Sequence, residues 1–329
     1  MAGAASNVAP GGWVKVDYSM MRLGALVLFC WVSGLASVQA APAPHPHWSA
    51  GFHELDFPDP LDHQPMHAIA FYPSTAKEQS SLLGGYQIDA AADAQIAIGR
   101  FPLLMLSHGN TGTPLALHDL ATSLARKGFV VVAVIHPGDN AQDHSRLGTL
   151  SNLYGRPIQI SEAITATLND PMLSPYVNAG QVGVIGYSAG GETALILSGA
   201  TPDLNRLRRY CQERPDDRDA CNTQGELIAD RDDLYPVADP RVRALLLMAP
   251  LSLKFGRHTL ADDDLPGLAG RHAAVVLLGQ ARRAVACLDA RLVVVAHGNA
   301  LRIAEVAAEQ HQRSDAAPVV AAAVVVDAR

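Results

Sequence analysis

Four runs of unbroken apolar residues alternate with amphipathic stretches between residues 101 and 248. The runs are FPLLMLS, VVVAV, VGVIGY and VRALLLM, and a loop or a helix pattern follows each of them. Continuous Val, Ile and Leu indicate strands that are buried on both faces. Strands of this kind, alternating with helices, predict an α/β fold with a mostly parallel central sheet and helices on both faces.

The stretches between the runs predict the helices. In LALHDLATSLARKG the apolar residues recur at helical spacing, and Gly128 is a typical C-terminal stop. SEAITATLND predicts a short helix, and SAGGETALIL predicts one that begins directly after a strand. Ligands of parallel sheets bind beyond the carboxyl ends of the strands, so the residues that carry chemistry are expected in the loops there.

The segment before residue 101 is predicted to add two more strands to the sheet. GFHELDFPDPLDHQPMHAIAFYPS has the pattern of two strands joined by a Pro-rich turn, an antiparallel hairpin at the sheet edge. The polar stretch from Ser74 to about Gly99 predicts a loop.

The N-terminal region has the layout of a signal peptide. An apolar block runs from Leu23 to Leu35, and the small residues Val38 and Ala40 precede a Pro-rich segment, which predicts cleavage after Ala40. The alternative is a membrane anchor, but the block is shorter than the roughly 20 residues of a spanning helix. Residues 1–40 are therefore predicted to be a signal peptide with an over-extended start, and the protein is expected to be exported with no stable membrane span.

Charge and length narrow the classes of function. The chain of 329 residues carries a formal net charge of −7 and has no run of Lys or Arg, which argues against nucleic acid as a partner. Its length suits one large α/β domain.

Two cysteines lie ten residues apart in the polar stretch RRYCQERPDDRDACNT. In an exported protein, Cys211 and Cys221 are natural disulfide partners. Two free surface thiols are an alternative. A zinc site is a weaker one, because no CxxC or paired His spacing accompanies them.

The central chemical signal is the serine in VGVIGYSAGG. Gly186-Tyr187-Ser188-Ala189-Gly190 is a GxSxG motif at the junction of an apolar strand and a helix. Such a junction is typical of a nucleophile elbow, in which glycines permit a sharp turn and the serine hydroxyl projects from the sheet. A purely structural turn is the alternative.

An acyl-transfer serine also needs donors for an oxyanion. The backbone N–H of Ala189, next to the nucleophile, is one candidate, and the N–H of Asn110 in the loop SHGNTG is the other. His108 in that loop could serve as a base, but a histidine at this position more often supports the loop.

Three further polar residues near these loops have a structural and a catalytic interpretation. His136 in IHPGDN lies within a turn, which favours a structural role. Asp139 and Glu192 are expected to be hydrogen-bonding or solvated groups, not members of a catalytic triad.

Taken in order, SHGNTG, HPGD and GYSAGG resemble the α/β-hydrolase superfamily over about residues 52–255. Within it, the chain is similar to the exported dienelactone-hydrolase-like branch that includes platelet-activating-factor acetylhydrolase. The resemblance implies hydrolysis of a carboxylic ester by Ser188, with no metal and no organic cofactor. It also implies that Cys211 and Cys221 form a pair.

The C-terminal segment departs from the family pattern. The family order Ser, Asp, His calls for an Asp and a His after late strands, but AAVVLLG is followed by Gln280 and Ala281. His297, in RLVVVAHG, is the base candidate of this segment, and Asp289 lies too close to it to be the acid. Asp262, Asp263 and Asp264 come too early.

Composition sets this segment apart as well. Residues 256–329 contain no aromatic residue, no Lys and no Met, and consist largely of Ala, Val, Leu and Arg. Either the segment is divergent and His297 is the base, or it is a frame-shifted C-terminus that has lost both acid and base. Composition and the unpaired Cys287 favour the second interpretation.

The sequence thus predicts an α/β-hydrolase domain at 41–255 that acts on small-molecule or lipid esters, followed by an atypical segment at 256–329. The alternative is a catalytically impaired hydrolase or a non-catalytic binding protein on the same fold. A peptidase of this fold is a narrower alternative, disfavoured because no substrate-gating domain is recognised before the motifs.

Overall fold

The computed structural model describes residues 47–217, 221, 226–255, 273–279 and 320–326. The described residues belong to one compact unit. The predicted signal peptide and His297 lie outside the described residues. The same is true of Cys287 and of most of the C-terminal segment.

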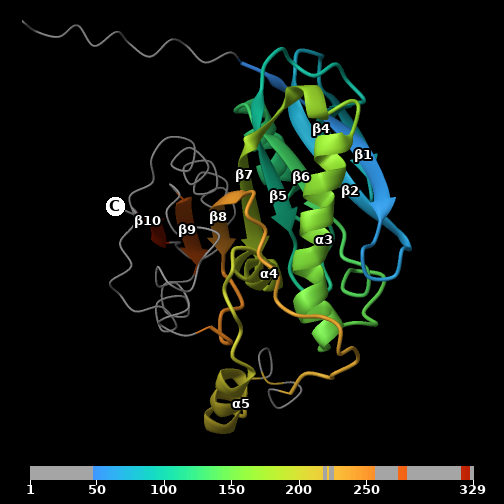
Figure 1. Ribbon diagram of the computed structural model, residues 1–329. Helices are drawn as coiled ribbons and strands as arrows, with labels where there is room; N and C mark the ends of the chain where they lie inside the picture. The colour runs from blue at the N-terminus through green and yellow to red at the C-terminus, as the bar shows by residue number, and fades with distance from the viewer. Residues whose placement is uncertain (1–46, 218–220, 222–225, 256–272, 280–319, 327–329) are drawn as a thin grey trace, which may run out of the picture. The chain divides into compact units, whose positions relative to one another are not determined.

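In the described residues, ten strands form one sheet in the order β10-β9-β8-β7-β5-β6-β2-β1-β4-β3 (Figure 1). The strands are β1 (Ser49–Pro58), β2 (Pro65–Ser74), β3 (Gln79–Leu83), β4 (Tyr86–Ala92), β5 (Phe101–Ser107), β6 (Val130–Val134), β7 (Val177–Tyr187), β8 (Val242–Met248), β9 (Ala273–Gly279) and β10 (Val320–Val326). Neighbouring strands pair in parallel along the order β6-β5-β7-β8-β9. An antiparallel pair lies on each side of this group, β2 with β6 and β10 with β9.

The predicted apolar runs are the central strands. All five residues of β6 are buried, and alternate ones belong to two different cores: Val130, Val132 and Val134 to one, Val131 and Ala133 to the other. A strand must be apolar on both faces when both faces of its sheet are covered. The unbroken runs therefore follow from the position of these strands in the middle of the sheet.

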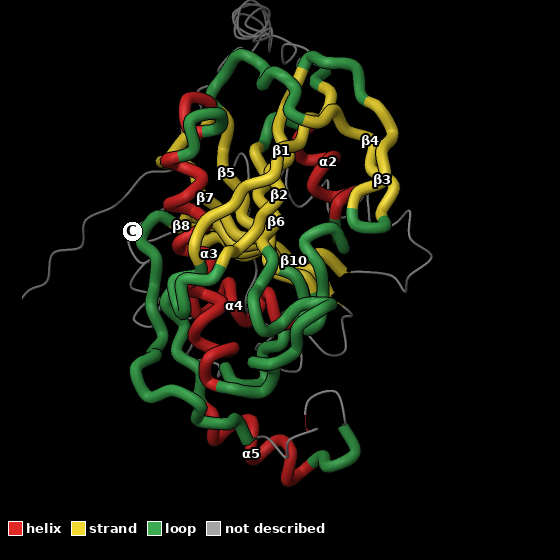
Figure 2. Tube along the Cα trace, turned by 90° about the vertical axis from the view of Figure 1, so that its right-hand side faces the viewer, coloured by secondary structure: helices red, strands yellow, loops and turns green. Residues whose placement is uncertain are grey.

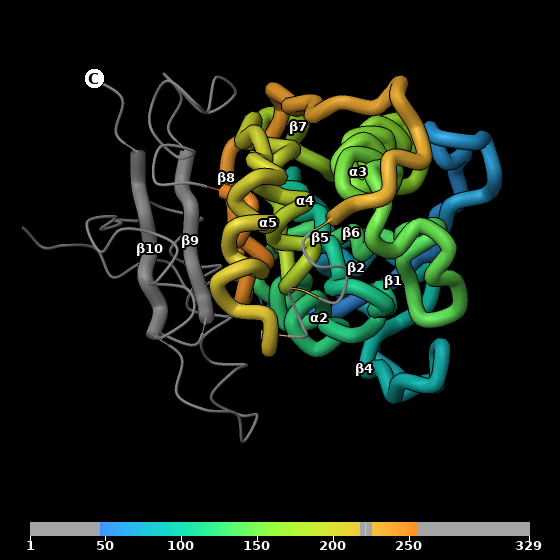
Figure 3. Tube along the Cα trace, turned by 90° about the horizontal axis from the view of Figure 1, so that it is seen from below, coloured from blue at the N-terminus to red at the C-terminus, as the bar shows by residue number. Residues whose placement is uncertain are grey.

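Helices supply the two covers (Figure 3). On one face lies α2 (His118–Arg126), which packs with Leu120 and Leu124 against the strands. On the other face lie α3 (Leu150–Asn169) and α4 (Ala189–Leu197), which contact each other. The predicted stop after α2 is confirmed, since Gly128 has a φ of +90° that disfavours other residues.

The N-terminal hairpin is confirmed, but its predicted place at the edge is wrong. Strands β1 and β2 pair antiparallel along their full length, and β2 continues the sheet through β6 while β1 pairs with β4. The pair is therefore interior, which agrees with the burial of most of β2.

The predicted loop from Ser74 to Gly99 is also wrong, because it contains the β3–β4 hairpin at the true edge of the sheet (Figure 2). The turn is Gly84-Gly85, with φ of +54° and +85°. Two consecutive residues with positive φ are what a tight hairpin turn needs, so this glycine pair was the missed signal. Since β3 is largely exposed, its residues lack the apolar pattern of a buried strand.

Helix α3 is longer than predicted. It begins at the cap Thr149, whose side chain accepts a hydrogen bond from the Asn152 N–H, and it continues through Pro157. Proline normally ends or bends a helix. Here the helix continues because the buried face on both sides of Pro157 packs on the sheet, with Leu153 and Ile160 in the core.

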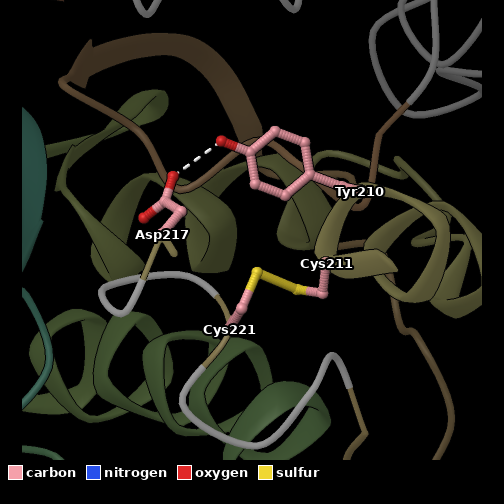
Figure 4. Close-up of a disulfide and its surroundings, with 4 residues drawn as sticks. All are labelled: Tyr210, Cys211, Asp217 and Cys221. Atoms are coloured by element: carbon pink, nitrogen blue, oxygen red, sulfur yellow. Dashed lines mark hydrogen bonds between the residues drawn. A yellow bond between two sulfur atoms is a disulfide. The ribbon is translucent and has the colours of Figure 1, made fainter. Parts of the chain in front are cut away.

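The disulfide between Cys211 and Cys221 is confirmed, with the two Cα atoms 5.4 Å apart (Figure 4). Cys211 lies in helix α5 (Leu204–Glu213), so part of the predicted polar loop is helical. Beside the disulfide, the Tyr210 hydroxyl donates to Asp217 Oδ2 at 2.6 Å. The short 3-10 helix η1 (Ser174–Tyr176) precedes β7.

The predicted fold class, an α/β-hydrolase fold, is confirmed by this sheet and by the strand–serine–helix junction between β7 and α4. The strand predicted at AAVVLLG is β9. Among the residues that the structure describes, no helix combines the length and the apolar character that crossing a membrane requires.

Candidate active site

Ser188 lies at the carboxyl edge of the sheet, between the end of β7 and the start of α4. Its φ of 52° and ψ of −114° make a sharp turn that a non-glycine residue seldom adopts. The side chain makes no capping hydrogen bond to the helix and is half-buried. The hydroxyl is therefore held at a surface of the molecule by a backbone that is itself constrained.

The glycines around Ser188 are required by close backbone contacts. A Cβ atom on Gly190 would lie 1.9 Å from the Ser107 carbonyl oxygen, and one on Gly186 would lie 2.2 Å from the Gly190 carbonyl oxygen. On Gly191 it would lie 2.5 Å from Pro250 Cβ. Any side chain at these positions would push the turn apart, which explains the motif GxSxGG.

Backbone hydrogen bonds tie the turn to the next strand. The Ser188 N–H donates to the Met248 carbonyl at 2.9 Å, and the Leu251 N–H donates to the Ser188 carbonyl at the same distance. Ser188 is thus fixed by β8 as well as by its own strand and helix.

The two predicted oxyanion donors lie beside this turn. Ala189 is the first residue of α4, where backbone N–H groups have no acceptor within the helix. The loop that holds Asn110 passes directly over the serine, since a Cβ atom on Gly109 would lie 3.2 Å from Ser188 Cβ. No described residue accepts a hydrogen bond from the N–H of Asn110 or of Ala189.

A buried ion pair bonds to the loop that contains Asn110. Arg156 Nη1 donates to Asp139 Oδ2 at 2.7 Å, and both side chains are almost wholly buried. Asp139 Oδ1 accepts from the Thr111 N–H at 2.7 Å, and Arg156 Nη2 donates to the His108 carbonyl. The pair therefore binds the loop on both sides of Asn110, and we call Arg156 and Asp139 the loop clamp.

A chain of buried polar groups extends from the loop clamp. Arg156 Nη2 also donates to Ser107 Oγ at 3.1 Å, and Ser107 Oγ bonds to His136 Nε2 at 2.9 Å. His136 Nδ1 donates to Gln159 Oε1 at 2.8 Å, and Gln159 Nε2 reaches the buried carboxylate of Asp59 at 3.2 Å. The partners assign the ring proton of His136 to Nδ1.

His108 is engaged through both ring nitrogens. Its Nδ1 donates to the Gly109 carbonyl at 2.7 Å, and its Nε2 accepts from the His136 N–H at 3.3 Å. Burial and then the nearby Arg156 charge lower the pKa of His108 to about 4. Burial and the same charge also hold the pKa of His136 well below its ordinary value. Both histidines are thus neutral supports of the loop, with no ring nitrogen left for Ser188.

A cavity of about 170 Å³ opens beside the two oxyanion candidates. Asn110 and Ala189 belong to its wall, as do Asn152 and Arg156 from α3. The segment after β8 closes another side and contributes Lys254, whose Nζ donates to Glu192 Oε1 at 2.7 Å in a buried pair.

The sequence interpretation missed three of these groups. Arg156 and Gln159 stand in a stretch where only a short helix farther along was predicted, and Lys254 lies in a loop. A charged or amide side chain within an otherwise apolar helix face is a signal of a buried polar contact, but it does not identify the partner. Asp139 and Glu192 were expected to be hydrogen-bonding or solvated groups; both are buried and bonded.

His297, the base candidate from sequence, is outside the described residues, and no described histidine is hydrogen-bonded to Ser188. Within the described part of the chain, no cluster of three or more His, Cys, Asp or Glu side chains is placed to hold a metal ion.

Comparison with known proteins gives structural similarity only. No protein-family model and no curated protein matches the chain. A solved ferulic acid esterase from Streptomyces cinnamoneus is similar with 19% identity and a TM-score of 0.44, over 73% of this chain and 75% of that one. A dienelactone hydrolase from Anabaena variabilis shows 12% identity and a TM-score of 0.37, over 70% and 74%.

A third solved structure, a bacterial heroin esterase, shows 15% identity and a TM-score of 0.33 over 72% of this chain and 54% of that one. The α/β-hydrolase fold of the present chain rests on its own sheet order and on the turn at Ser188.

Proposed function

We propose that the chain is a serine hydrolase that cleaves carboxylic esters, with Ser188 as the nucleophile. The observation that carries the proposal is the strained turn at Ser188, between a buried strand and a helix N-terminus, with two N–H groups beside it that find no acceptor in the described part of the chain. This is the arrangement that acyl transfer by a serine needs.

The proposed reaction has two steps. Ser188 Oγ attacks the ester carbonyl, and the N–H groups of Asn110 and Ala189 stabilise the negative charge that develops on the carbonyl oxygen. The proton that Ser188 loses passes through the general base to the departing alcohol, which leaves an acyl-enzyme. Water then attacks the acyl carbon, the carboxylic acid is released, and the proton returns to Ser188 Oγ. Removing one such donor typically lowers kcat by about 10²–10³. The general base and the acid remain unassigned.

The substrate is proposed to be a small-molecule or lipid ester, without a metal or an organic cofactor. We also propose that the protein is exported after removal of residues 1–40, and that residues 41–255 make up the hydrolase domain, whose sheet β9 and β10 extend. The disulfide between Cys211 and Cys221 supports an oxidising compartment.

Labelling with an organophosphonate ester tests the nucleophile. Mass spectrometry of the purified wild-type protein should find the adduct on the peptide that contains Ser188, and Ser188→Ala should remain unlabelled. Ser198→Ala is a matched control, because Ser198 is buried at the other end of α4. An adduct on another serine in an active preparation would refute the assignment.

A second candidate function is a catalytically impaired or non-catalytic hydrolase-fold protein. It is favoured by the engagement of both described loop histidines and by the unusual composition of residues 256–329. Losing the base of a catalytic triad lowers kcat by about 10⁶.

Hydrolysis of p-nitrophenyl acetate separates the two candidates. It should be measured for the chain as written, for His297→Ala, and for a version whose C-terminus is restored to the alternative reading frame. If the written chain matches the restored one and His297→Ala abolishes activity, His297 is the base and the impaired candidate fails.

A further inference from the structure

The Asn110 N–H, one of the two expected oxyanion donors, belongs to a peptide unit that is held through its carbonyl. In a planar trans peptide the N–H points away from the C=O, so the Gly109 carbonyl and the Asn110 N–H have opposite directions. The Gly109 carbonyl accepts from His108 Nδ1 at 2.7 Å and from the Gly112 N–H at 3.1 Å. These two bonds therefore fix the direction in which the Asn110 N–H points.

The loop clamp holds the peptide units on both sides of this one. In the preceding unit, the His108 carbonyl accepts from Arg156 Nη2. In the following unit, the Thr111 N–H donates to Asp139 Oδ1 at 2.7 Å. Turning the peptide unit that lies between would strain or break one of these bonds, so the ion pair opposes any rotation of the donor.

Thr111 indicates that the loop does not hold this shape by its own preference. Its φ is 53°, in a region that a β-branched residue rarely adopts. Its side chain is exposed, so packing of that side chain does not impose the conformation. The hydrogen bond from its N–H to Asp139 does oppose relaxation. Without that bond Thr111 would relax toward negative φ, and the neighbouring donor peptide would turn with it.

Asp139 acts from behind the cavity. It is fully buried and is not part of the cavity wall, whereas Arg156 and Asn152 are. These two side chains donate to Asp139 Oδ2 at 2.7 and 2.9 Å, which fixes the carboxylate that holds the Thr111 N–H. A substitution of Asp139 therefore changes the support of the loop without removing a group from the cavity wall.

We infer that Asp139, fixed by Arg156, is a positioning residue that keeps the Asn110 N–H aimed at the ester oxygen on which negative charge develops. The inference rests on the proposed function, because it takes Ser188 as the nucleophile and the Asn110 N–H as an oxyanion donor. Such a donor acts mainly in the transition state, where the oxygen carries charge, and much less on the bound ester. Loss of Asp139 should therefore lower kcat and leave KM nearly unchanged.

Asp139→Asn tests the inference in the full chain, with p-nitrophenyl acetate as substrate. The amide has one oxygen, which cannot serve both the Thr111 N–H and the two donors at Oδ2 as the carboxylate does, so the loop loses part of its support. We expect kcat to fall about 10²-fold, as for removal of one oxyanion donor, and KM to stay within about twofold. Expressing kcat per Ser188 titrated with the organophosphonate ester leaves misfolded protein out of the comparison.

An alkyl trifluoromethyl ketone supplies a readout that a merely structural role would not move. Its reversible adduct with a serine carries an oxyanion, so its inhibition constant should rise by about the factor by which kcat falls. Glu78→Gln is the matched control. Glu78 also pairs with an arginine, Arg126, and also accepts a backbone N–H, that of Ala50, but none of the three lines the cavity. Both constants should stay near the wild-type values in this control.

Two changes at Thr111 keep the test decisive even if Asp139→Asn folds poorly. Glycine adopts a positive φ without strain, so kcat of Asp139→Asn/Thr111→Gly should recover to within about tenfold of the wild type. Replacing Thr111 by its α-hydroxy acid exchanges the backbone N–H for an oxygen and leaves the ion pair intact. There kcat should fall about tenfold, for one lost hydrogen bond.

An unchanged kcat in Asp139→Asn, a rise in KM alone, no recovery in the double variant, or an unchanged kcat in the α-hydroxy variant would each overturn the inference. If any of these results is obtained while the wild type hydrolyses the ester and is labelled at Ser188, the proposed function stands without it. If the wild type neither hydrolyses the ester nor is labelled, the proposed function fails, and this inference fails with it.

Discussion

Two buried ion pairs of equal length lie near Ser188, and they are built differently. Arg156 and Asp139 are joined at 2.7 Å, and each also bonds to the backbone of the loop that holds Asn110. Lys254 and Glu192 are also joined at 2.7 Å, but among the described residues they make no other side-chain hydrogen bond.

The difference indicates different roles. A buried ion pair alone often contributes little to stability, because removing two charges from water offsets their attraction. The loop clamp has additional hydrogen bonds to neutral groups, and these fix the position of a loop. The Lys254–Glu192 pair instead joins the first turn of α4 to the segment after β8. We therefore expect the two pairs to respond differently to the same kind of substitution.

The largest expected effect is from Arg156→Met. It leaves the fully buried Asp139 carboxylate without its charge partner, and the free energy of unfolding should fall by about 4 kcal/mol. Urea unfolding followed by circular dichroism measures the change. Arg126→Met, which breaks a partly exposed pair with Glu78, should have a much smaller effect. Similar losses in the two variants would contradict the special role of the loop clamp.

His108, whose carbonyl bonds to the loop clamp, predicts a dependence of stability on pH. Folding holds the pKa of His108 at about 4, whereas an unfolded histidine titrates near 6.5. As the pH falls, the unfolded chain binds the proton first, so stability is lost between about pH 6.5 and pH 4. The loss from this group should reach about 3 kcal/mol.

Urea unfolding of the wild type and of His108→Gln at pH 7.5 and pH 5 measures this dependence. The variant should lose less stability than the wild type between the two pH values. An unchanged difference would mean that His108 is not the group responsible.

The second pair lies near a region that is held by a covalent bond. Cys211 and Cys221 are buried with Leu207 and contact Leu253, the neighbour of Lys254. Replacing both cysteines with serine opens a loop of ten residues and should lower the free energy of unfolding by about 3 kcal/mol on the chain-entropy model. Thermal unfolding with and without reductant checks it, and the variant should be insensitive to reductant.

The smallest expected effect distinguishes the two pairs most directly. Lys254→Met leaves Glu192 buried but in the first turn of α4, where the helix dipole favours a negative charge, so the loss should be about 2 kcal/mol. The double variant Lys254→Met/Glu192→Leu should return to within about 1 kcal/mol of the wild type.

The equivalent double variant of the loop clamp, Arg156→Met/Asp139→Leu, should not recover. It leaves the Thr111 N–H and the Asn152 amide without their acceptor. Recovery in both double variants, measured by urea unfolding, would show that the two pairs are alike after all.

Elements that depend only on their own residues could be predicted from the sequence. Buried central strands must be apolar on both faces, and the turn at Ser188 excludes side chains at Gly186 and Gly190. The hairpin of β3 and β4 was not predicted, because the largely exposed edge strand β3 lacks that apolar pattern. Its turn, Gly84-Gly85, is the local sequence signal for this hairpin.

The supports of the site could not be predicted in the same way. Arg156 bonds to Ser107 and His108, which lie 49 and 48 residues earlier in the chain. Only the folded sheet brings these segments together, and a single sequence contains no signal for a contact between residues so far apart in the chain. The acid and the base are a different case, since the candidates offered by the sequence lie beyond the described residues.

The turn at Ser188 also has an implication for engineering the protein. Its φ of 52° strains any residue except glycine, at about 1–3 kcal/mol. Ser188→Gly should therefore make the chain more resistant to heat while removing the group proposed to do chemistry. Selection for thermal tolerance alone would favour that change, so a library screened for stability needs an activity screen beside it.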